Sequence, residues 1–196
     1  EFIDKNHALI NTLMYYFMGE PFLNKNSYEM IRYARKKNIY VETCTNGDFV
    51  DARGVIYSDI NKISFQIGGM TEKTHQIYRV ASSLEKIKKN LFELIDERKK
   101  NPESNVTIEL GFIVMRHNEH EVEKFLKWSN EINVDVANII DPCVRNMVEG
   151  YAYLPKDKKY WFYDSEAFEL GKLKPKVMPK NSCEWIWNSM QINWDG

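Results

Sequence analysis

The chain has 196 residues, with 27 Lys and Arg against 28 Asp and Glu, so its formal net charge at pH 7 is −1. This balance gives none of the long-range positive field that binding to nucleic acid or to an anionic membrane uses, and we expect neither partner. The mean hydropathy is −0.52, and the longest apolar run, 13–18, falls far short of the roughly 18 residues that cross a membrane. These features favour a soluble globular domain.

The three cysteines, Cys44, Cys143 and Cys183, lie far apart in the sequence and form no C-x-x-C pair. This sparse spacing is unlike a secreted disulfide scaffold and favours a reducing, cytoplasmic location. It also excludes a local zinc or iron–sulfur knuckle, so any cluster would take ligands from outside these residues. The chain begins at Glu1 without a signal-peptide pattern, and we expect it to be a fragment of a larger protein.

The first predicted strand is the continuous apolar and aromatic run 13–18, which ends at Gly19-Glu20-Pro21. A helix is predicted after it, ending near Asn38, because apolar residues share one face and cations gather in the last turn. The run 39–43 is the second predicted strand, and Thr45-Asn46-Gly47 ends it. The order is thus strand, helix, strand.

The same rhythm continues to the end of the predicted sheet. The predicted strand 63–67 runs into Gly68-Gly69, and the segment 84–95 keeps the three-and-four spacing of an amphipathic helix. The predicted strand 106–115 follows, and Asn118 with Glu121 has the form of a capping box for the next helix. The run 134–140, before Asp141-Pro142, is the fifth predicted strand.

Five strands alternating with helices predict an α/β fold with an all-parallel sheet in sequential order. The strands show little alternation, so we expect both faces of the sheet to be covered. The strand near residue 13 should lie at an edge that lacks its neighbour. The ends of all five strands should meet at the carboxyl edge, which is where α/β proteins place their ligand sites.

Residues 151–182 differ from the rest, with seven Lys, three Pro and seven aromatic residues. We interpret this segment as a linker that crosses the domain surface and is held there by the aromatic patch 160–163.

The strand-end motifs, taken together, resemble the radical S-adenosylmethionine enzymes. The resemblance rests on Gly19-Glu20-Pro21, Thr45-Asn46-Gly47, Gly68-Gly69 and the segment from Thr74 to Arg79, in that order. The end of the chain, from Cys183 to Gly196, is similar to the opening of a SPASM extension, which carries auxiliary iron–sulfur clusters. These likenesses together cover most of the chain.

The resemblance implies a partial (β/α)6 TIM-like barrel of which strands two to six are present in 1–150, followed by the linker 151–182 and the start of a SPASM-like domain in 183–196. It implies a [4Fe–4S] cluster and S-adenosylmethionine as cofactors, an electron donor for the cluster, and an oxidoreductase-like activity. The reductive cleavage of S-adenosylmethionine would give a 5′-deoxyadenosyl radical that abstracts hydrogen from a substrate, with a peptide or protein as the favoured class.

The resemblance also assigns roles to residues at the carboxyl edge. Gly19, Glu20 and Pro21 would receive the methionine ammonium, and Arg79 would bind the methionine carboxylate through its guanidinium fork. Asn46 would lie on the cavity floor. The remaining implied residues are Gln66, near the cofactor, and Cys183, a ligand of an auxiliary cluster in the intact parent protein.

Several features depart from that family. Gln66 stands where the family has a Ser that faces the cofactor, and Gly68 stands where it has an Asp. The C-x-x-x-C-x-x-C loop that defines the family is absent, so we expect these 196 residues alone to hold no catalytic cluster and to be inactive.

Two other interpretations remain open at this stage. One is a noncatalytic interaction module that uses the aromatic patch 160–163 as its contact surface. The other is a cluster-free α/β enzyme that binds a nucleotide, although no glycine-rich phosphate loop follows a predicted strand. His75, His117, His120 and Cys143 are further candidates for ligands or bases, but such residues are more often structural.

Overall fold

The computed structural model describes residues 1–178 and 183–193. Five strands within this part of the chain form an all-parallel sheet in the sequential order β1-β2-β3-β4-β5. They are β1 (Thr12–Met14), β2 (Tyr40–Thr45), β3 (Lys62–Ile67), β4 (Thr107–Ile113) and β5 (Val136–Ile140). The predicted α/β class and strand order are confirmed.

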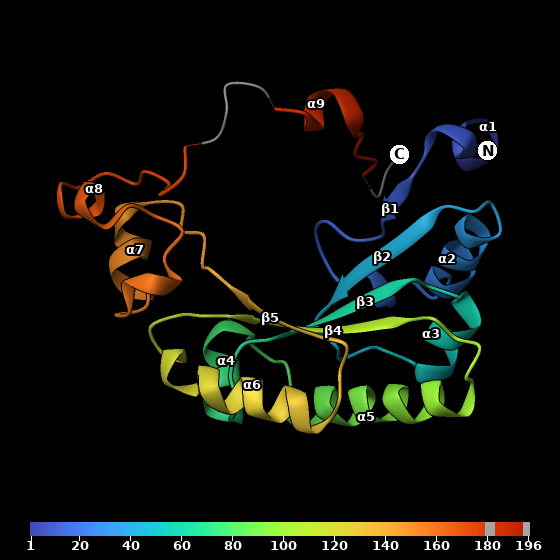
Figure 1. Ribbon diagram of the computed structural model, residues 1–196, viewed down its shortest axis with the longest axis horizontal. Coiled ribbons are helices and arrows are strands. Elements are labelled where there is room, and N and C mark those ends of the chain that lie inside the picture. The colour runs from blue at the N-terminus through green and yellow to red at the C-terminus, as the bar shows by residue number, and fades with distance from the viewer. Residues whose placement is uncertain (179–182, 194–196) are drawn as a thin grey trace.

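Helices α4, α5 and α6 lie along one face of the sheet, below it in Figure 1. Helix α2 packs on β2, and α3 packs between α2 and α5. The helices are α1 (Phe2–Asn6), α2 (Ser27–Arg35), α3 (Ala52–Ser58), α4 (Glu72–Tyr78), α5 (Leu84–Lys100), α6 (Val122–Glu131), α7 (Met147–Tyr153), α8 (Ser165–Glu169) and α9 (Trp185–Asn188).

The helix-covered face of the sheet carries the main hydrophobic core. Its strand residues alternate along the chain, and α5 meets them with Ile87, Leu91 and Leu94, all fully buried as the three-and-four spacing predicts. Burial of each such side chain contributes about 1.5–3 kcal/mol. The fully or almost fully buried strand residues of this core are Val41, Ile63, Phe65, Ile67, Ile108, Leu110 and Phe112.

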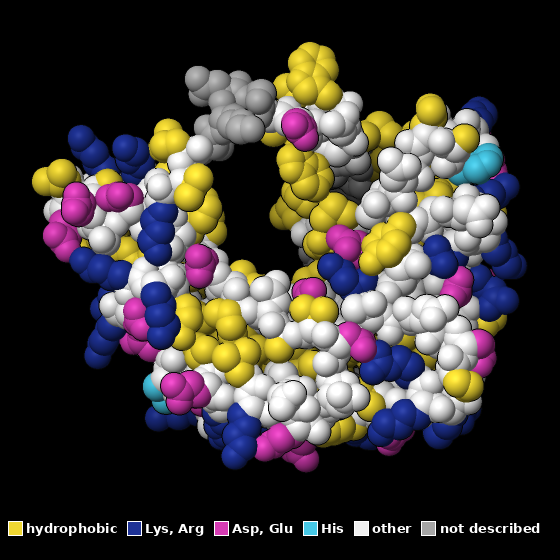
Figure 2. Space-filling view, viewed as in Figure 1, with side chains coloured by type: hydrophobic (Ala, Val, Ile, Leu, Met, Phe, Trp, Pro, Cys, Tyr) yellow, Lys and Arg dark blue, Asp and Glu magenta, His cyan; other side chains and the backbone are white. Residues whose placement is uncertain are grey.

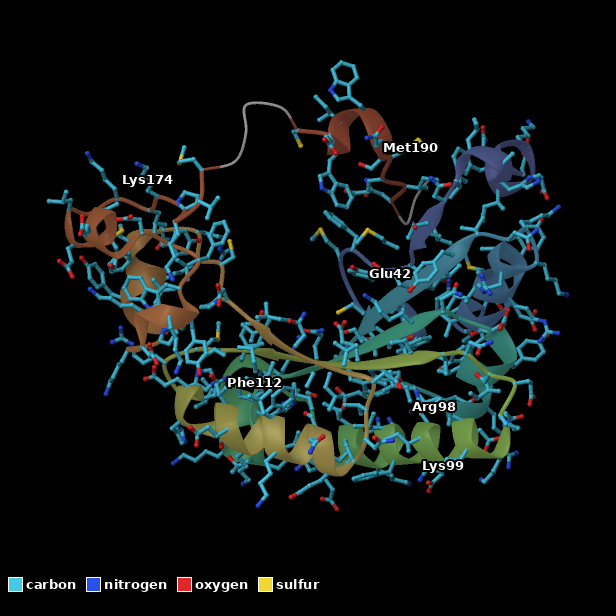
Figure 3. All side chains as sticks on the ribbon, in the orientation of Figure 1. Glu42, Arg98, Lys99, Phe112, Lys174 and Met190 are labelled. Atoms are coloured by element: carbon cyan, nitrogen blue, oxygen red, sulfur yellow. The ribbon has the colours of Figure 1, made fainter. Side chains whose placement is uncertain are left out.

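The other face of the sheet is polar, so the expectation of two covered faces is wrong. The intervening strand positions include Glu42, Lys62 and Glu109, and helices of the main body pack only on the opposite side. Figure 3 shows Glu42 on the side away from these helices and Phe112 on their side. Figure 2 shows an opening over the polar face, bounded by other parts of the molecule.

Strand β1 is shorter than the predicted run 13–18. It pairs with β2 through three residues, from Thr12 to Met14, while Phe17 and Met18 are 70% and 87% exposed. The strand is therefore shorter than predicted, and the prediction that it is buried is wrong, because Leu13 is half-buried and Thr12 and Met14 are exposed. The physical reason is that β1 is an edge strand, with a partner on one side only among the described residues. The predicted unpaired edge near residue 13 is confirmed.

The segment before α5 forms a helix of its own and is not part of one long helix. Helix α4 is separate from α5, and Ala81 between them adopts a left-handed conformation with φ of +62°. Asn118 and Glu121 do not form the predicted capping box. Their side chains instead bond to the loops that end β3 and β4.

Residues 144–177 form a small unit around an aromatic cluster of their own. Trp161, Tyr163 and Phe168 are buried there against Val144 and Leu154. Tyr163 and Pro175 form an isolated antiparallel bridge. Two of the four residues of the patch 160–163 are thus internal, which argues against its use as a contact surface. The domain boundaries near residues 150 and 183 stay predictions.

The described part of the chain contains no helix that is both long and apolar enough to cross a membrane.

Candidate functional site

Glu20 joins the ends of β1 and β2. Its carboxylate oxygen Oε1 accepts hydrogen bonds from the hydroxyl of Thr45 (2.7 Å) and the backbone N–H of Phe22 (3.2 Å), while Oε2 accepts one from the backbone N–H of Asn46 (2.7 Å). Glu20 also caps the short 3-10 helix η2 (Pro21–Leu23), where Pro at the first position favours the helical start. Two of the predicted motifs, Gly19-Glu20-Pro21 and Thr45-Asn46-Gly47, therefore meet in one place.

The turn after β2 is closed by its own side chains. Thr45 Oγ1 accepts a hydrogen bond from the N–H of Gly47 (3.0 Å), and Asn46 Oδ1 accepts one from the N–H of Asp48 (2.9 Å). Gly47 has φ of +83°, and a Cβ there would lie 2.8 Å from Cγ2 of Ile87. Glycine is needed at this position both for the backbone conformation and for the close approach of α5.

Arg79 follows α4 and lies against the end of β3. A Cβ on Gly68 would lie 3.2 Å from Cγ of Arg79, so the glycine leaves room for the arginine stem. The guanidinium carbon is 5.2 Å from the ring centre of Tyr78, and Nε is buried without a hydrogen-bond partner among the described residues. A buried donor of this kind costs stability until an acceptor meets it. Arg79 is thus arranged to receive an anionic or carbonyl oxygen.

Cys44 lies on the polar face among charged side chains. Burial raises the pKa of the Cys44 thiol to about 11, while the positive charge of Arg79 opposes this and the negative charges of Glu20 and Glu109 add to it. The thiol is protonated at neutral pH and is therefore a weak nucleophile.

Gln66 belongs to a buried polar chain on the same face. Its Nε2 donates a hydrogen bond to Ser64 (2.9 Å), and the Ser64 hydroxyl donates to Oε1 of Glu109 (2.7 Å). The Gln66 side chain lies over Gly111, where a Cβ would come within 2.5 Å of Nε2. Gln66 therefore faces the polar side of the sheet, as the resemblance requires, and its role toward a cofactor stays a prediction.

Lys62 binds two carboxylates across three strands. Its Nζ is 3.0 Å from Glu42 on β2 and 3.7 Å from Glu109 on β4. The hydrogen bond to Glu42 raises the pKa of Lys62 above its ordinary value. Tyr16 lies in the loop after β1. Burial raises the pKa of its hydroxyl, and the negative charge of Glu42 raises it further, so this loop lies close to the ion pairs of Lys62.

His75 is buried and holds the loop after β3. Its Nδ1 accepts a hydrogen bond from the N–H of Gly68 (3.1 Å), which leaves Nε2 to donate to Ser82 (3.1 Å). Burial lowers the pKa of His75, in keeping with a neutral ring. This residue has a structural role.

Asn118 and Glu121 reach the same loop from beyond β4, and the sequence analysis missed this role. Asn118 is fully buried and donates to the carbonyl oxygen of Gly68 (2.9 Å), and Glu121 accepts from the N–H of Met70 (2.8 Å). In the sequence, these two polar residues stand just beyond a predicted strand. A capping box at the start of the next helix accounts for the same pattern, so their position did not reveal the bonds to the loop after β3.

The remaining candidates are His117, close to Gly68 and Glu121, and three residues for which no contact with the site is seen in the described chain. Burial lowers the pKa of His117, whose Nε2 is buried without a partner in the described chain. His120 is exposed. Cys143 and Cys183 are exposed free thiols, and the Sγ of Cys143 is 3.4 Å from the hydroxyl of Tyr163. Trp194 and Gly196, part of the predicted SPASM opening, lie outside the described residues.

Two shallow depressions lie elsewhere on the surface. One, of about 410 Å³, is at the amino-terminal edge beside Arg98, and the other, of about 460 Å³, is between the start of α6 and residues 156–160. Neither includes Glu20, Asn46 or Arg79. The candidate site lies at the carboxyl ends of β1, β2 and β3, outside both depressions.

No protein-family model and no curated protein matches the chain. Among solved structures, archaeal TYW1 is similar over 79% of this chain and 51% of that chain, with a TM-score of 0.50 and 11% identity. TYW1 with a lysine–pyruvate adduct bound matches over 66% and 41%, with a TM-score of 0.49 and 13% identity. Native anSMEcpe with bound AdoMet matches over 62% and 35%, with a TM-score of 0.48 and 18% identity.

These neighbours are radical S-adenosylmethionine enzymes. At 11% identity, the likeness to archaeal TYW1 shows a common fold alone, and the TM-scores of the other two are too low to add to it. The fold is an α/β fold of five parallel strands with flanking helices, consistent with a partial TIM-like core. The chain spans about a third to a half of the length of these neighbours.

The site fits one of the two implied cofactors. The unpartnered Nε of Arg79, with Gly68 beneath its stem, suits the carboxylate of S-adenosylmethionine. An iron–sulfur cluster does not fit, because no group of three His, Cys, Asp or Glu residues in 1–178 and 183–193 is arranged to hold a metal.

Proposed function

We propose that this chain is the core of a radical S-adenosylmethionine enzyme and binds S-adenosylmethionine at the carboxyl edge of its sheet. The observation that carries the proposal is Arg79, whose buried Nε has no partner in the described chain and whose stem lies against Gly68 at the end of β3, at the same carboxyl edge as the joined strand ends at Glu20 and Asn46. The likeness of fold to archaeal TYW1 supports it.

Each residue of the site has a part in holding the cofactor. The guanidinium of Arg79 binds the methionine carboxylate with two parallel hydrogen bonds. The ammonium lies by Gly19-Glu20-Pro21, where Oε2 of Glu20 accepts one bond from the chain and keeps acceptor capacity. Asn46 and Gln66 line the floor and the polar face beside the adenosyl group.

In this enzyme class the bound cofactor supplies a carbon-centred radical for hydrogen abstraction. This chain contributes the position of the cofactor and a polar surface on which a substrate lies. A peptide or protein substrate and an electron donor are part of the proposal. Cys183 is proposed to ligate an auxiliary cluster in a parent protein that supplies further cysteines.

Cofactor binding to the chain, measured by equilibrium dialysis, tests the proposal. The two ligands are S-adenosylmethionine and 5′-methylthioadenosine, which lacks the amino-acid group. Arg79→Lys keeps the charge but loses the fork, and Arg79→Ala loses both, so each should weaken S-adenosylmethionine binding by about 10- to 100-fold. Binding of 5′-methylthioadenosine should change little.

The matched control is Arg98→Ala, which removes an arginine at the amino-terminal edge of the sheet, where it binds Asp135. It should leave both affinities unchanged. A wild-type chain that does not bind S-adenosylmethionine, or Arg79 variants that bind it as tightly as the wild type, would contradict the proposal.

A further inference from the structure

We propose that Asn118 and Glu121, on the turn between β4 and α6, are positioning residues that set the place of Arg79 in the cofactor site. The inference rests on the proposed function for its ligand. Within the described chain neither side chain makes a hydrogen bond to Arg79, so both act through the loop after β3 and through α4.

Helix α4, which carries Arg79 at its end, has little apolar packing to fix it. It spans seven residues, from Glu72 to Tyr78, and His75 is its one buried residue. A helix this short is not stable by itself, because helix formation pays a nucleation cost that only longer helices recover. Its position must therefore come from tertiary contacts, and most of the ones that the structure shows are polar.

Asn118 fixes the loop at the start of this segment. It is fully buried, and its Nδ2 donates to the carbonyl oxygens of Gly68 and Ile113, both at 2.9 Å. Its Oδ1 accepts a hydrogen bond from the N–H of Met115 (2.7 Å). One amide thus ties the end of β3 to the end of β4 and uses both of its polar atoms.

Glu121 fixes the first turn of α4. Glu121 is buried, with only 5% of its surface exposed. Oε2 accepts a hydrogen bond from the N–H of Met70 (2.8 Å), and Oε1 accepts one from the hydroxyl of Thr74 (3.1 Å). A buried carboxylate costs free energy unless such donors meet it, so the bonds hold the loop and the helix in one arrangement.

The link from this clamp to Arg79 is short. The His75 ring accepts from the N–H of Gly68, and the His75 carbonyl accepts from the N–H of Arg79 (2.9 Å). The Arg79 stem then lies on Gly68, within 3.2 Å of where a Cβ would be. A shift of α4 relative to Gly68 would therefore move the guanidinium, and binding groups tolerate only about 0.5 Å of such movement.

A double-mutant cycle of Glu121 and Arg79 tests the inference. The affinity of each variant of the full chain for S-adenosylmethionine is measured by equilibrium dialysis. Glu121→Ala should weaken binding at least about fivefold in the wild-type background and less than about twofold when Arg79 is already Ala, because coupled residues are not additive. Glu121→Gln, which keeps the shape and one acceptor, should restore most of the affinity.

The control for a loss of stability is Asn61→Ala. Asn61 accepts a hydrogen bond from the N–H of Val41 (2.8 Å) at the opposite edge of the sheet, so its loss lowers stability without touching the clamp. At equal loss of melting temperature, Asn118→Ala should weaken binding and Asn61→Ala should not. If Asn118→Ala does not fold, the Glu121 variants carry the test.

A second readout separates this inference from the proposed function. The Nε–H signal of Arg79 in NMR spectra should shift in Glu121→Ala and stay in place in Asn61→Ala, whether or not a ligand is present. A wild-type chain that does not bind S-adenosylmethionine overturns the proposed function. An Arg79 signal unmoved by Glu121→Ala, or an additive double-mutant cycle, overturns the positioning role.

Discussion

Glu20 accepts a hydrogen bond from the backbone N–H of Asn46 at 2.7 Å, and this bond joins the ends of β1 and β2. The same carboxylate accepts from Thr45 and Phe22, so three donors depend on one side chain. Strand β1 pairs with β2 over only three residues. Because β1 makes few backbone hydrogen bonds to β2, the Glu20 carboxylate helps to hold this edge strand in place.

Replacing Glu20 by Ala should lower the free energy of unfolding by about 2 kcal/mol, because partly buried donors lose a charged acceptor. Urea unfolding followed by circular dichroism measures this. Glu123→Ala removes an exposed carboxylate from α6 and should change stability by less than about 0.5 kcal/mol. Equal effects of the two substitutions would show that Glu20 does not fasten β1.

Gly19 is a matched control for Gly47, which lies in the turn after β2. Both have positive φ, +91° at Gly19 and +83° at Gly47, but a Cβ on Gly47 would meet Ile87 at 2.8 Å and one on Gly19 would meet nothing within 4 Å. Gly19→Ala should cost about 1–2 kcal/mol from backbone strain. Gly47→Ala should cost at least about 1 kcal/mol more from overpacking, as measured by urea unfolding. A smaller cost at Gly47 would contradict this packing.

The three thiols should differ in reactivity. Burial raises the pKa of Cys44 to about 11, so at pH 8 only about one molecule in a thousand carries its thiolate. Cys143 and Cys183 are exposed. Iodoacetamide at pH 8, followed by mass spectrometry of the peptides, should label these two well before Cys44. Labelling of Cys44 at the same rate would mean that its thiol is open and ionised.

Acid should weaken the loop after β3. Burial lowers the pKa of His75 in the folded chain, and its Nδ1 accepts from Gly68, so the folded state resists protonation. The unfolded state takes up the proton near pH 6.5, and stability should therefore fall as the pH drops through this value. His75→Gln should reduce the difference in unfolding free energy between pH 7.5 and 5.5, while His120→Gln, at an exposed position, should not. An unchanged difference in His75→Gln would contradict the assignment.

The sheet order and the turns that follow β1 and β2 were predictable because they depend on local patterns, although β1 itself ends earlier than its apolar run. Gly19 and Gly47 mark these turns, since both adopt a positive φ. The polar face was not predicted, since Ser64 and Gln66 are buried polar residues within apolar runs and their partners lie on other strands. The bonds of Glu121 likewise reach 47 and 51 residues back along the chain, beyond any local rule.

NMR mapping of S-adenosylmethionine on the ¹⁵N-labelled chain tests the central claim most directly. The amide signals of residues 19, 20, 22, 45–48 and 68–70 and the Nε–H of Arg79 should shift on titration, and signals at the amino-terminal edge, including Asn61 and Asp135, should not. Shifts gathered at the amino-terminal edge, or no saturable shifts at all, would contradict a cofactor site at the carboxyl edge.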